Sequence, residues 1–231
     1  MQILSIRVYA NISNIDADFP TALIIPNKEE VNVPVGSTAY GYVAHDGGSI
    51  FTDGREFFLF EDMFFCAQEN STIKGLQGFI CIRENYRGIF NLGGPIEKLG
   101  RLRYIDGCSD TLLLSPIILG DPCLNYLYVP PHIDQTPHTH PSVRVGIILA
   151  GKGYCNAENG TFDLAPGSVF VLPTGEEHSF HTQEDNLRIF IFHPDSDFGP
   201  THETHPMINK TYKDGLSLKG LNRYRTEKIR A

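Results

Sequence analysis

The amino-acid sequence predicts an all-β protein built from two barrels in tandem. Short runs rich in β-branched and aromatic residues recur along the 231-residue chain. Turn sequences such as HDGG, TDG, AGKG, ENG, APG and PTG separate these runs. Long segments with helical periodicity are missing, and many short, regularly spaced strands are typical of a sandwich or a barrel.

The strands are expected at regular intervals along the chain. Each expected strand has alternating or continuous apolar character and is bounded by turn-forming residues. We expect strands at Ile3–Tyr9, Ala39–Ala44, Glu56–Phe60, Met63–Cys66, Gly78–Ile82, Leu124–Val129, Val143–Leu149, Ser168–Leu172 and Leu187–Phe192.

A weak internal repeat predicts how the chain is divided. Gly41 and Gly153 each begin a strand that turns, returns and leads into a further strand, and FICI at 79–82 matches IFIF at 189–192. A chance similarity between two β-rich stretches is the alternative explanation. The repeat predicts a first domain over residues 1–110, a second over 111–195 and a tail over 196–231.

Composition excludes several classes of protein and partner. The formal net charge of −8, from 19 Lys and Arg against 27 Asp and Glu, argues against nonspecific binding of nucleic acid and of anionic membranes. No run of about 18 apolar residues is present, and the N-terminus lacks the pattern of a signal peptide. The five cysteines form no C-x-x-C pair. We therefore expect a cytoplasmic protein with reduced thiols.

Three histidines suggest a metal site in the second half. His138 and His140 are two residues apart, and alternate residues of a strand share one face, so both imidazoles are expected to point the same way. His178 follows the turn sequence PTG and is expected on a neighbouring antiparallel strand about 5 Å away. Three imidazoles on one face are a ligand set for a divalent ion such as Fe²⁺, Zn²⁺, Mn²⁺ or Ni²⁺.

The stretch that contains His178 resembles the second motif of the cupin superfamily, G-x5-P-x-G-x2-H-x3-N. Gly167, Pro173, Gly175 and His178 match that motif at its spacing, and Thr182 replaces its last residue. The resemblance implies a jelly-roll barrel with a metal site. Because the first half matches only in its pattern of strands and turns, the whole chain resembles a bicupin whose N-terminal half is degenerate.

The first cupin motif, G-x5-H-x-H-x3-4-E-x6-G, is matched with one departure. His138, His140 and Gly151 match, but Arg144 stands where the family has a metal-binding glutamate. Arginine stays protonated and cannot bind a cation. If Arg144 shares a face with the histidines, it could instead hold an anionic substrate group by a bidentate contact. The alternative is that Arg144 turns outward to a surface acid.

Other candidates for the site are less specific. Tyr126 and Tyr128 could offer hydroxyl groups to a substrate, although tyrosines in strands are more often part of a core or its rim. His132, beside two prolines, could enter the mouth of the barrel as a further ligand or a base, or it could be an ordinary loop residue. The tail contains THETH at 201–205, which fits either a metal-binding spacing or a polar surface loop.

Two functions are consistent with these observations. The cupin resemblance implies a metal-dependent enzyme of the dioxygenase, isomerase or decarboxylase type acting on a small organic acid, with Arg144 orienting the substrate. The alternative is a noncatalytic cupin that binds or senses a small ligand, which the loss of the acidic ligand favours. In both cases we expect a homodimer, because edge strands of open barrels often pair.

Overall fold

A computed structural model describes residues 1–195, 212–213 and 216–217 of the chain. It confirms the all-β prediction, since the described secondary structure is β-strand except for one 3-10 turn, η1 (Ile105–Gly107). The described part of the chain contains no helix with the length and apolar character needed to span a membrane. The predicted tail motif at 201–205 lies outside the described residues.

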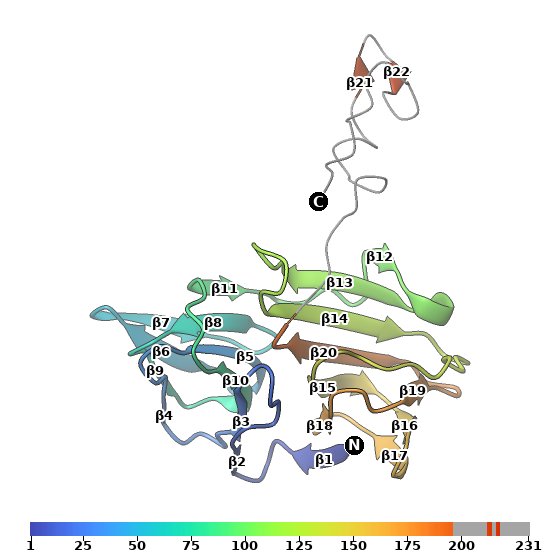
Figure 1. Cartoon of the computed structure of the whole chain (residues 1–231), viewed down its shortest axis with the longest axis horizontal. Helices are drawn as coiled ribbons and strands as arrows, with labels where there is room; N and C mark the ends of the chain where they lie inside the picture. The colour runs from blue at the N-terminus through green and yellow to red at the C-terminus, as the bar shows by residue number, and fades with distance from the viewer. Residues whose placement is uncertain (196–211, 214–215, 218–231) are drawn as a thin grey trace.

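The first half of the chain forms a barrel from two sheets, of six and four strands, drawn at the left of Figure 1. The larger sheet has the order β11-β8-β5-β10-β3-β2, and the smaller has the order β4-β9-β6-β7. These strands are β2 (Ala10–Ile12), β3 (Thr21–Ile25), β4 (Val31–Asn32), β5 (Thr38–His45), β6 (Gly48–Thr52), β7 (Arg55–Leu59), β8 (Phe64–Gln68), β9 (Thr72–Lys74), β10 (Gln77–Arg83) and β11 (Asn91–Gly93).

The second half forms a barrel of the same design, drawn at the right of Figure 1. Its larger sheet has the order β1-β18-β15-β20-β14-β13-β12, and its smaller sheet has the order β17-β16-β19. These strands are β1 (Gln2–Ser5), β12 (Leu102–Arg103), β13 (Ser109–Leu114), β14 (Cys123–Val129), β15 (Arg144–Gly151), β16 (Gly153–Ala157), β17 (Gly160–Leu164), β18 (Ser168–Leu172), β19 (His178–His181) and β20 (Leu187–His193). A short separate hairpin pairs β21 (Tyr212–Lys213) with β22 (Leu216–Ser217).

The internal repeat is present in the structure, but its register differs from the prediction. In both barrels a glycine of the central strand faces an aromatic ring of its neighbour: an added Cβ would lie 2.3 Å from the ring of Phe65 at Gly41 and 2.3 Å from the ring of Phe170 at Gly146. Gly41 therefore corresponds to Gly146 in β15, and not to Gly153, which begins β16. The sequence comparison passed over one strand because both hairpins are rich in glycine.

The two barrels pack against each other through their larger sheets. Aromatic side chains of β5 and β20 pack against each other with tilted rings. The ring centroids are 5.2 Å apart for Tyr40 and Phe192 and 5.0 Å apart for Tyr42 and Phe190. All four rings are buried. Because aromatic rings bury large apolar areas, this layer holds the barrels together in a fixed relation.

The N-terminal segment joins the second barrel, although it precedes the first. β1 pairs with β18 in antiparallel register, from Gln2 opposite Val171 to Ser5 opposite Ser168. Likewise, β12 lies in the larger sheet of the second barrel. The domain limits at 110 and 195 stay predictions. β1 and β12 precede residue 110 and β13 spans it, yet all three belong to the larger sheet of the second barrel.

Asp16 connects this N-terminal segment to the region of the candidate site. Its buried carboxylate accepts hydrogen bonds from the backbone N–H of Val143, at 2.8 Å, and from the hydroxyl of Thr174, at 3.1 Å. Val143 directly precedes β15, and Thr174 lies in the turn before β19. One side chain thus links the starts of the two segments that carry candidate site residues.

We expect Asp16→Ala to lower the free energy of unfolding by about 3 kcal/mol, because it leaves a buried N–H without its charged acceptor. Urea denaturation monitored by circular dichroism measures this change. Asp18→Ala, which removes an exposed carboxylate two residues away, is the matched control. Equal stability of the two variants would contradict the structural role of Asp16.

Candidate metal centre

The histidines of the candidate site come from two segments of the second barrel. His178 begins β19, whereas His138 and His140 lie in the connection between β14 and β15. The prediction that the latter two share a regular strand is therefore wrong. Pro137 and Pro141, which flank the pair, have no N–H to donate to a ladder, so the pair itself forms an isolated bridge, between His138 and His178, instead of a strand.

The extended connection still brings the three imidazoles together. One nitrogen from each of His138, His140 and His178 lies within 4.8 Å of the others. The ring centroids are 4.6 Å apart for His138 and His178 and 5.0 Å apart for each of the other two pairs. This set could hold one metal ion, and it is the grouping that the sequence predicted.

Backbone carbonyls orient two of the three rings. Nδ1 of His138 lies 2.9 Å from the carbonyl oxygen of Thr136, and Nδ1 of His178 lies 3.0 Å from that of Glu176. A carbonyl only accepts hydrogen bonds, so each Nδ1 carries the proton and each Nε2 presents a lone pair. A ring held in this way is prepared to bind a metal through Nε2.

Burial keeps the imidazoles of His140 and His178 neutral. Desolvation, followed by the nearby charge of Arg144, lowers the pKa of His140 to about 2. Desolvation likewise lowers the pKa of His178 to about 4, against a partly compensating hydrogen bond to Glu176. Neutral imidazole is the form that binds a metal, so at pH 7 these two ligands need not lose a proton first.

The three histidines line one end of a cavity inside the second barrel. The cavity leaves about 60 Å³ for the centres of water-sized molecules, and one water needs about 10–15 Å³ on that measure. Five apolar side chains contribute to its wall: Leu127, Phe170, Leu172, Phe180 and Ile191. The cavity therefore suits a small ligand with an apolar part.

Arg144 lines the same cavity, at the start of β15. Its side chain is buried, and Nη1 donates to the backbone oxygens of Ser142, at 3.0 Å, and Val143, at 3.2 Å, and to the Ser142 hydroxyl, at 2.7 Å. These contacts fix the guanidinium at the wall. The positively charged group therefore lies at the wall of the cavity.

Further polar groups line the cavity that sequence reasoning missed. Asp110 lies in β13, where it is buried and accepts a hydrogen bond of 2.8 Å from the amide of Asn125. His193 was not among the predicted site residues, and it is the last residue of β20. No motif marks either residue, and the alternation of β14, which turns Asn125 inward, is the signal that could have found them. The other polar lining residues are Tyr104 and Gln135.

Asp110 gives a pH-dependent prediction for stability. Burial raises the pKa of its carboxyl from 3.8 to about 6. The folded protein therefore keeps this proton to higher pH than the unfolded chain does, and stability is lost as pH rises from about 4 to about 6. A rise of this size corresponds to about 3 kcal/mol above pH 6. Asp110→Asn keeps an acceptor for Asn125 without the charge.

We expect Asp110→Asn to be more stable relative to wild type at pH 8 than at pH 4. Urea denaturation at both pH values measures the difference, and Asp163→Asn, an exposed change in β17, is the control. A difference between Asp110→Asn and wild type that does not change with pH would contradict the raised pKa.

Three sequence-predicted substrate residues lie away from the cavity. Tyr126 and Tyr128 share the opposite face of β14 from the lining residues Asn125 and Leu127, because side chains alternate along a strand. Tyr126 packs between the barrels, and its hydroxyl donates to the carbonyl of Lys98 at 2.7 Å.

His132 is exposed, and its Nε2 lies 3.8 Å from a carboxylate oxygen of Glu184. Its positive φ of 61° places it in a turn at the rim. The placement of Tyr126, Tyr128 and His132 in a substrate pocket is thereby corrected.

The first barrel has other residues at the corresponding positions. Ile50 pairs with Ile73 in the first barrel as Cys155 pairs with Phe180 in the second, so Ser71 takes the place of His178. The N–H of Val33 donates to the carbonyl of Ser71 at 2.9 Å, as that of His138 does to His178 at 3.0 Å. Val33 and Val35 therefore stand where the second barrel has His138 and His140.

The fold and the second motif have counterparts among known proteins. Residues 130–199 match the family model described as the AraC-like ligand binding domain. No curated protein matches the chain in sequence. A cupin 2 conserved barrel domain protein from Leptotrichia buccalis is 16% identical, with a TM-score of 0.58 over 83% of this chain and 95% of that one.

Two further solved structures share the arrangement of both barrels. Protein Ylba from E. coli is 14% identical, with a TM-score of 0.56 over 86% of this chain and 92% of that one. A salicylate 1,2-dioxygenase from Pseudoaminobacter salicylatoxidans, determined as an adduct with gentisate, is 9% identical, with a TM-score of 0.56 over 82% of this chain and 72% of that one. At these identities the likeness is one of fold.

Proposed function

This chain has the fold of the bicupins, and on that premise we propose that it is a metal-dependent enzyme acting on a small organic acid. The reaction would be of the dioxygenase, isomerase or decarboxylase type. One observation carries the proposal: three clustered histidines and one arginine line the same small cavity. The first barrel would serve as a support that covers the larger sheet of the second.

A divalent ion would be held by Nε2 of His138 and His178 and by His140. The fit rests on the donor set, since three close imidazoles with two Nδ1 atoms tied to carbonyls match what Fe²⁺ or Zn²⁺ requires. When bound, such an ion supplies Lewis acidity or a centre for oxygen activation. Three protein ligands leave open positions for a substrate.

Arg144 would hold the acid group of the substrate. A metal site and a guanidinium in one cavity put two positive groups near each other, and an anion between them relieves the repulsion. The contacts of Nη1 to Ser142 and Val143 hold the guanidinium in place, which prepares it to orient a carboxylate. Arg144 is then a substrate-binding residue, and its charge would polarise the acid for reaction.

The size and lining of the cavity support a small acid with an apolar part. Space for about 60 Å³ of water centres admits a few atoms of a ligand without rearrangement. The gentisate adduct of the salicylate dioxygenase shows that a small aromatic acid occupies a protein with this fold. The phenyl rings of Phe170 and Phe180 in the wall suit an apolar group of that kind.

A noncatalytic ligand-binding role is the second candidate. The match of residues 130–199 to a ligand-binding domain favours it, as does the absence of a carboxylate at position 144. The same cavity would then bind and release an acid without any reaction. Homodimer formation stays a prediction under both functions.

Turnover distinguishes the two candidates. The protein, purified without chelators and loaded with Fe²⁺, is incubated with a panel of small organic acids while oxygen consumption is recorded and products are identified by mass spectrometry. The enzyme proposal predicts conversion of at least one acid. Tight binding of an acid that is recovered unchanged, with and without oxygen and with each of the four candidate metals, would instead establish the binding role.

A further inference from the structure

The connection that contains His138 and His140 pairs with β19, but no continuous ladder of backbone hydrogen bonds runs between them. Two isolated bridges join them, Asp134 to His181 and His138 to His178. Three residues of the connection, 135–137, lie between these bridges, whereas only Ser179 and Phe180 of β19 do. Pro137 interrupts the backbone pairing where the extra residue is accommodated. Backbone hydrogen bonds join the two segments where Thr182 meets Ile133, Gln135 meets Phe180 and His138 meets His178, and side chains between these points add to them.

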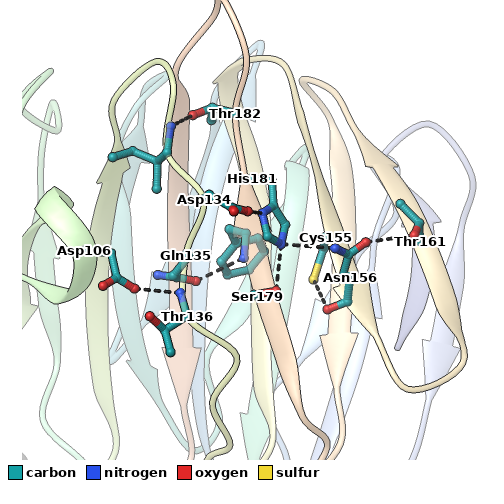
Figure 2. A network of polar contacts seen from close by, with 12 residues as sticks. Asp106, Asp134, Gln135, Thr136, Cys155, Asn156, Thr161, Ser179, His181 and Thr182 are labelled. Atoms are coloured by element: carbon teal, nitrogen blue, oxygen red, sulfur yellow. Dashed lines mark hydrogen bonds and ion pairs between the residues drawn. The ribbon is translucent and has the colours of Figure 1, made fainter.

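A network around His181 joins the two segments at the far bridge, and Figure 2 shows it. Nδ1 of His181 is hydrogen-bonded to the carboxylate of Asp134. Its Nε2 lies 2.7 Å from the hydroxyl of Ser179 and 3.2 Å from the amide nitrogen of Asn156. The ring stacks on Tyr154, with centroids 4.8 Å apart and planes at 12°. Contacts to both ring nitrogens and to one ring face thus fix the orientation of His181.

The network specifies one form of the imidazole. The amide oxygen of Asn156 accepts a hydrogen bond from Thr161, at 2.8 Å, which turns its NH₂ group toward His181. Nε2 of His181 therefore faces two donors and accepts, so Nδ1 carries the proton and donates to Asp134. Because the tautomer is fixed, His181 is always the donor and Asp134 always the acceptor in this hydrogen bond.

The same strand carries the metal ligand and this anchor on opposite faces. His178 and Phe180 line the cavity, whereas Ser179 and His181 point away from it. Asp134 lies four residues before His138, and its side chain is 93% exposed, so its bond to His181 buries little apolar surface. What that bond contributes is the location of the connection.

We propose that Asp134 and His181 are positioning residues for the metal centre, which set the register of the connection and thereby the positions of His138 and His140 relative to His178. The inference rests on the proposed metal site and assigns to it two residues outside the cavity. Two hydrogen bonds between Gln135 and Phe180 also hold the connection on the cavity side. The backbone N–H of Gln135 donates to the carbonyl of Phe180 at 3.2 Å, and the backbone N–H of Phe180 donates to the side-chain oxygen of Gln135 at 3.0 Å.

Binding of Co²⁺ tests the proposal, because its d–d absorption reports ligand geometry and its affinity is measured by competition with a chelator. We expect Asp134→Ala to weaken Co²⁺ binding about tenfold and to change the absorption spectrum. Removal of a group that orients a metal ligand typically lowers metal affinity by this amount. Asp134→Asn keeps an acceptor for Nδ1–H and should lie between Asp134→Ala and wild type. The melting temperature in chelator should change little.

Glu184→Gln is the matched control for loss of charge. Glu184 is 93% exposed, like Asp134, and it lies near His132 on the same side of the barrel. We expect it to leave both Co²⁺ affinity and the spectrum unchanged. His181→Phe keeps the ring on Tyr154 and removes both nitrogens, and its effect should not add to that of Asp134→Ala in the double variant.

The outcomes separate this inference from the proposed function. Wild-type affinity and spectrum in Asp134→Ala would overturn the positioning role while leaving the metal site intact. An equal loss in Asp134→Ala and Glu184→Gln would overturn it as well, because the effect would then be one of general charge. Failure of the wild-type protein to bind Co²⁺ would overturn the metal centre itself.

Discussion

Replacement of His140 by alanine is expected to weaken binding of a divalent metal by more than about 100-fold. This loss of affinity is larger than the loss expected when a group that only orients a ligand is removed. The site has three protein ligands within 4.8 Å of one another, and two imidazoles alone hold a divalent ion poorly. The change also removes the stabilisation that metal gives the folded state, about 2.7 kcal/mol at 100 times the dissociation constant.

Metal content by elemental analysis and melting temperature with and without added metal measure these effects. His132→Ala is the control, because it removes an exposed histidine outside the cavity. A full equivalent of metal retained per chain in His140→Ala would contradict the assignment of this residue as a ligand.

Reversal of the charge at position 144 is expected to change metal and anion binding in opposite directions. Arg144→Glu places a carboxylate four residues after His140, where it can join the histidines as a further ligand, so metal affinity should rise. The same carboxylate repels an acid ligand and removes a charged hydrogen bond worth about 1.5–3 kcal/mol, so affinity for a carboxylate should fall at least about tenfold.

Arg144→Lys should fall between the wild type and Arg144→Glu in carboxylate affinity, since it keeps the charge and loses the planar fork. Calorimetric titration of a carboxylate into the metal-loaded proteins gives both comparisons, and circular dichroism verifies the fold. If Arg144→Glu leaves metal content and carboxylate affinity unchanged, Arg144 is not a substrate clamp.

The sequence predicted nine of the strands and the grouping of three histidines because both depend on local pattern. Ser168–Leu172 is a strand with the predicted bounds, and the run at Ala39–Ala44 lies within β5. The spacing of His138 and His140 survives the loss of a regular strand, since any extended backbone places alternate residues on one face. The turn before His178 then brings the third imidazole to them.

Other features could not be predicted because they depend on long-range packing. Which face of β14 turns inward follows from the neighbouring barrel, whose Tyr42 packs against Phe190 and draws Tyr126 to the outer side. His193 and Asp110 carry no motif, and they reach the cavity only through the register of β20 and β13 with β14. The pairing of β1 with β18 likewise has no local signal.

Metal content of the wild-type protein tests the central claim most directly. The protein is purified without chelators and without added metal, and iron, zinc, manganese and nickel are counted per chain by elemental analysis. The triad of His138, His140 and His178 predicts about one equivalent of a single divalent metal. A protein that carries no metal as purified, and takes up none of the four on incubation, would contradict the claim.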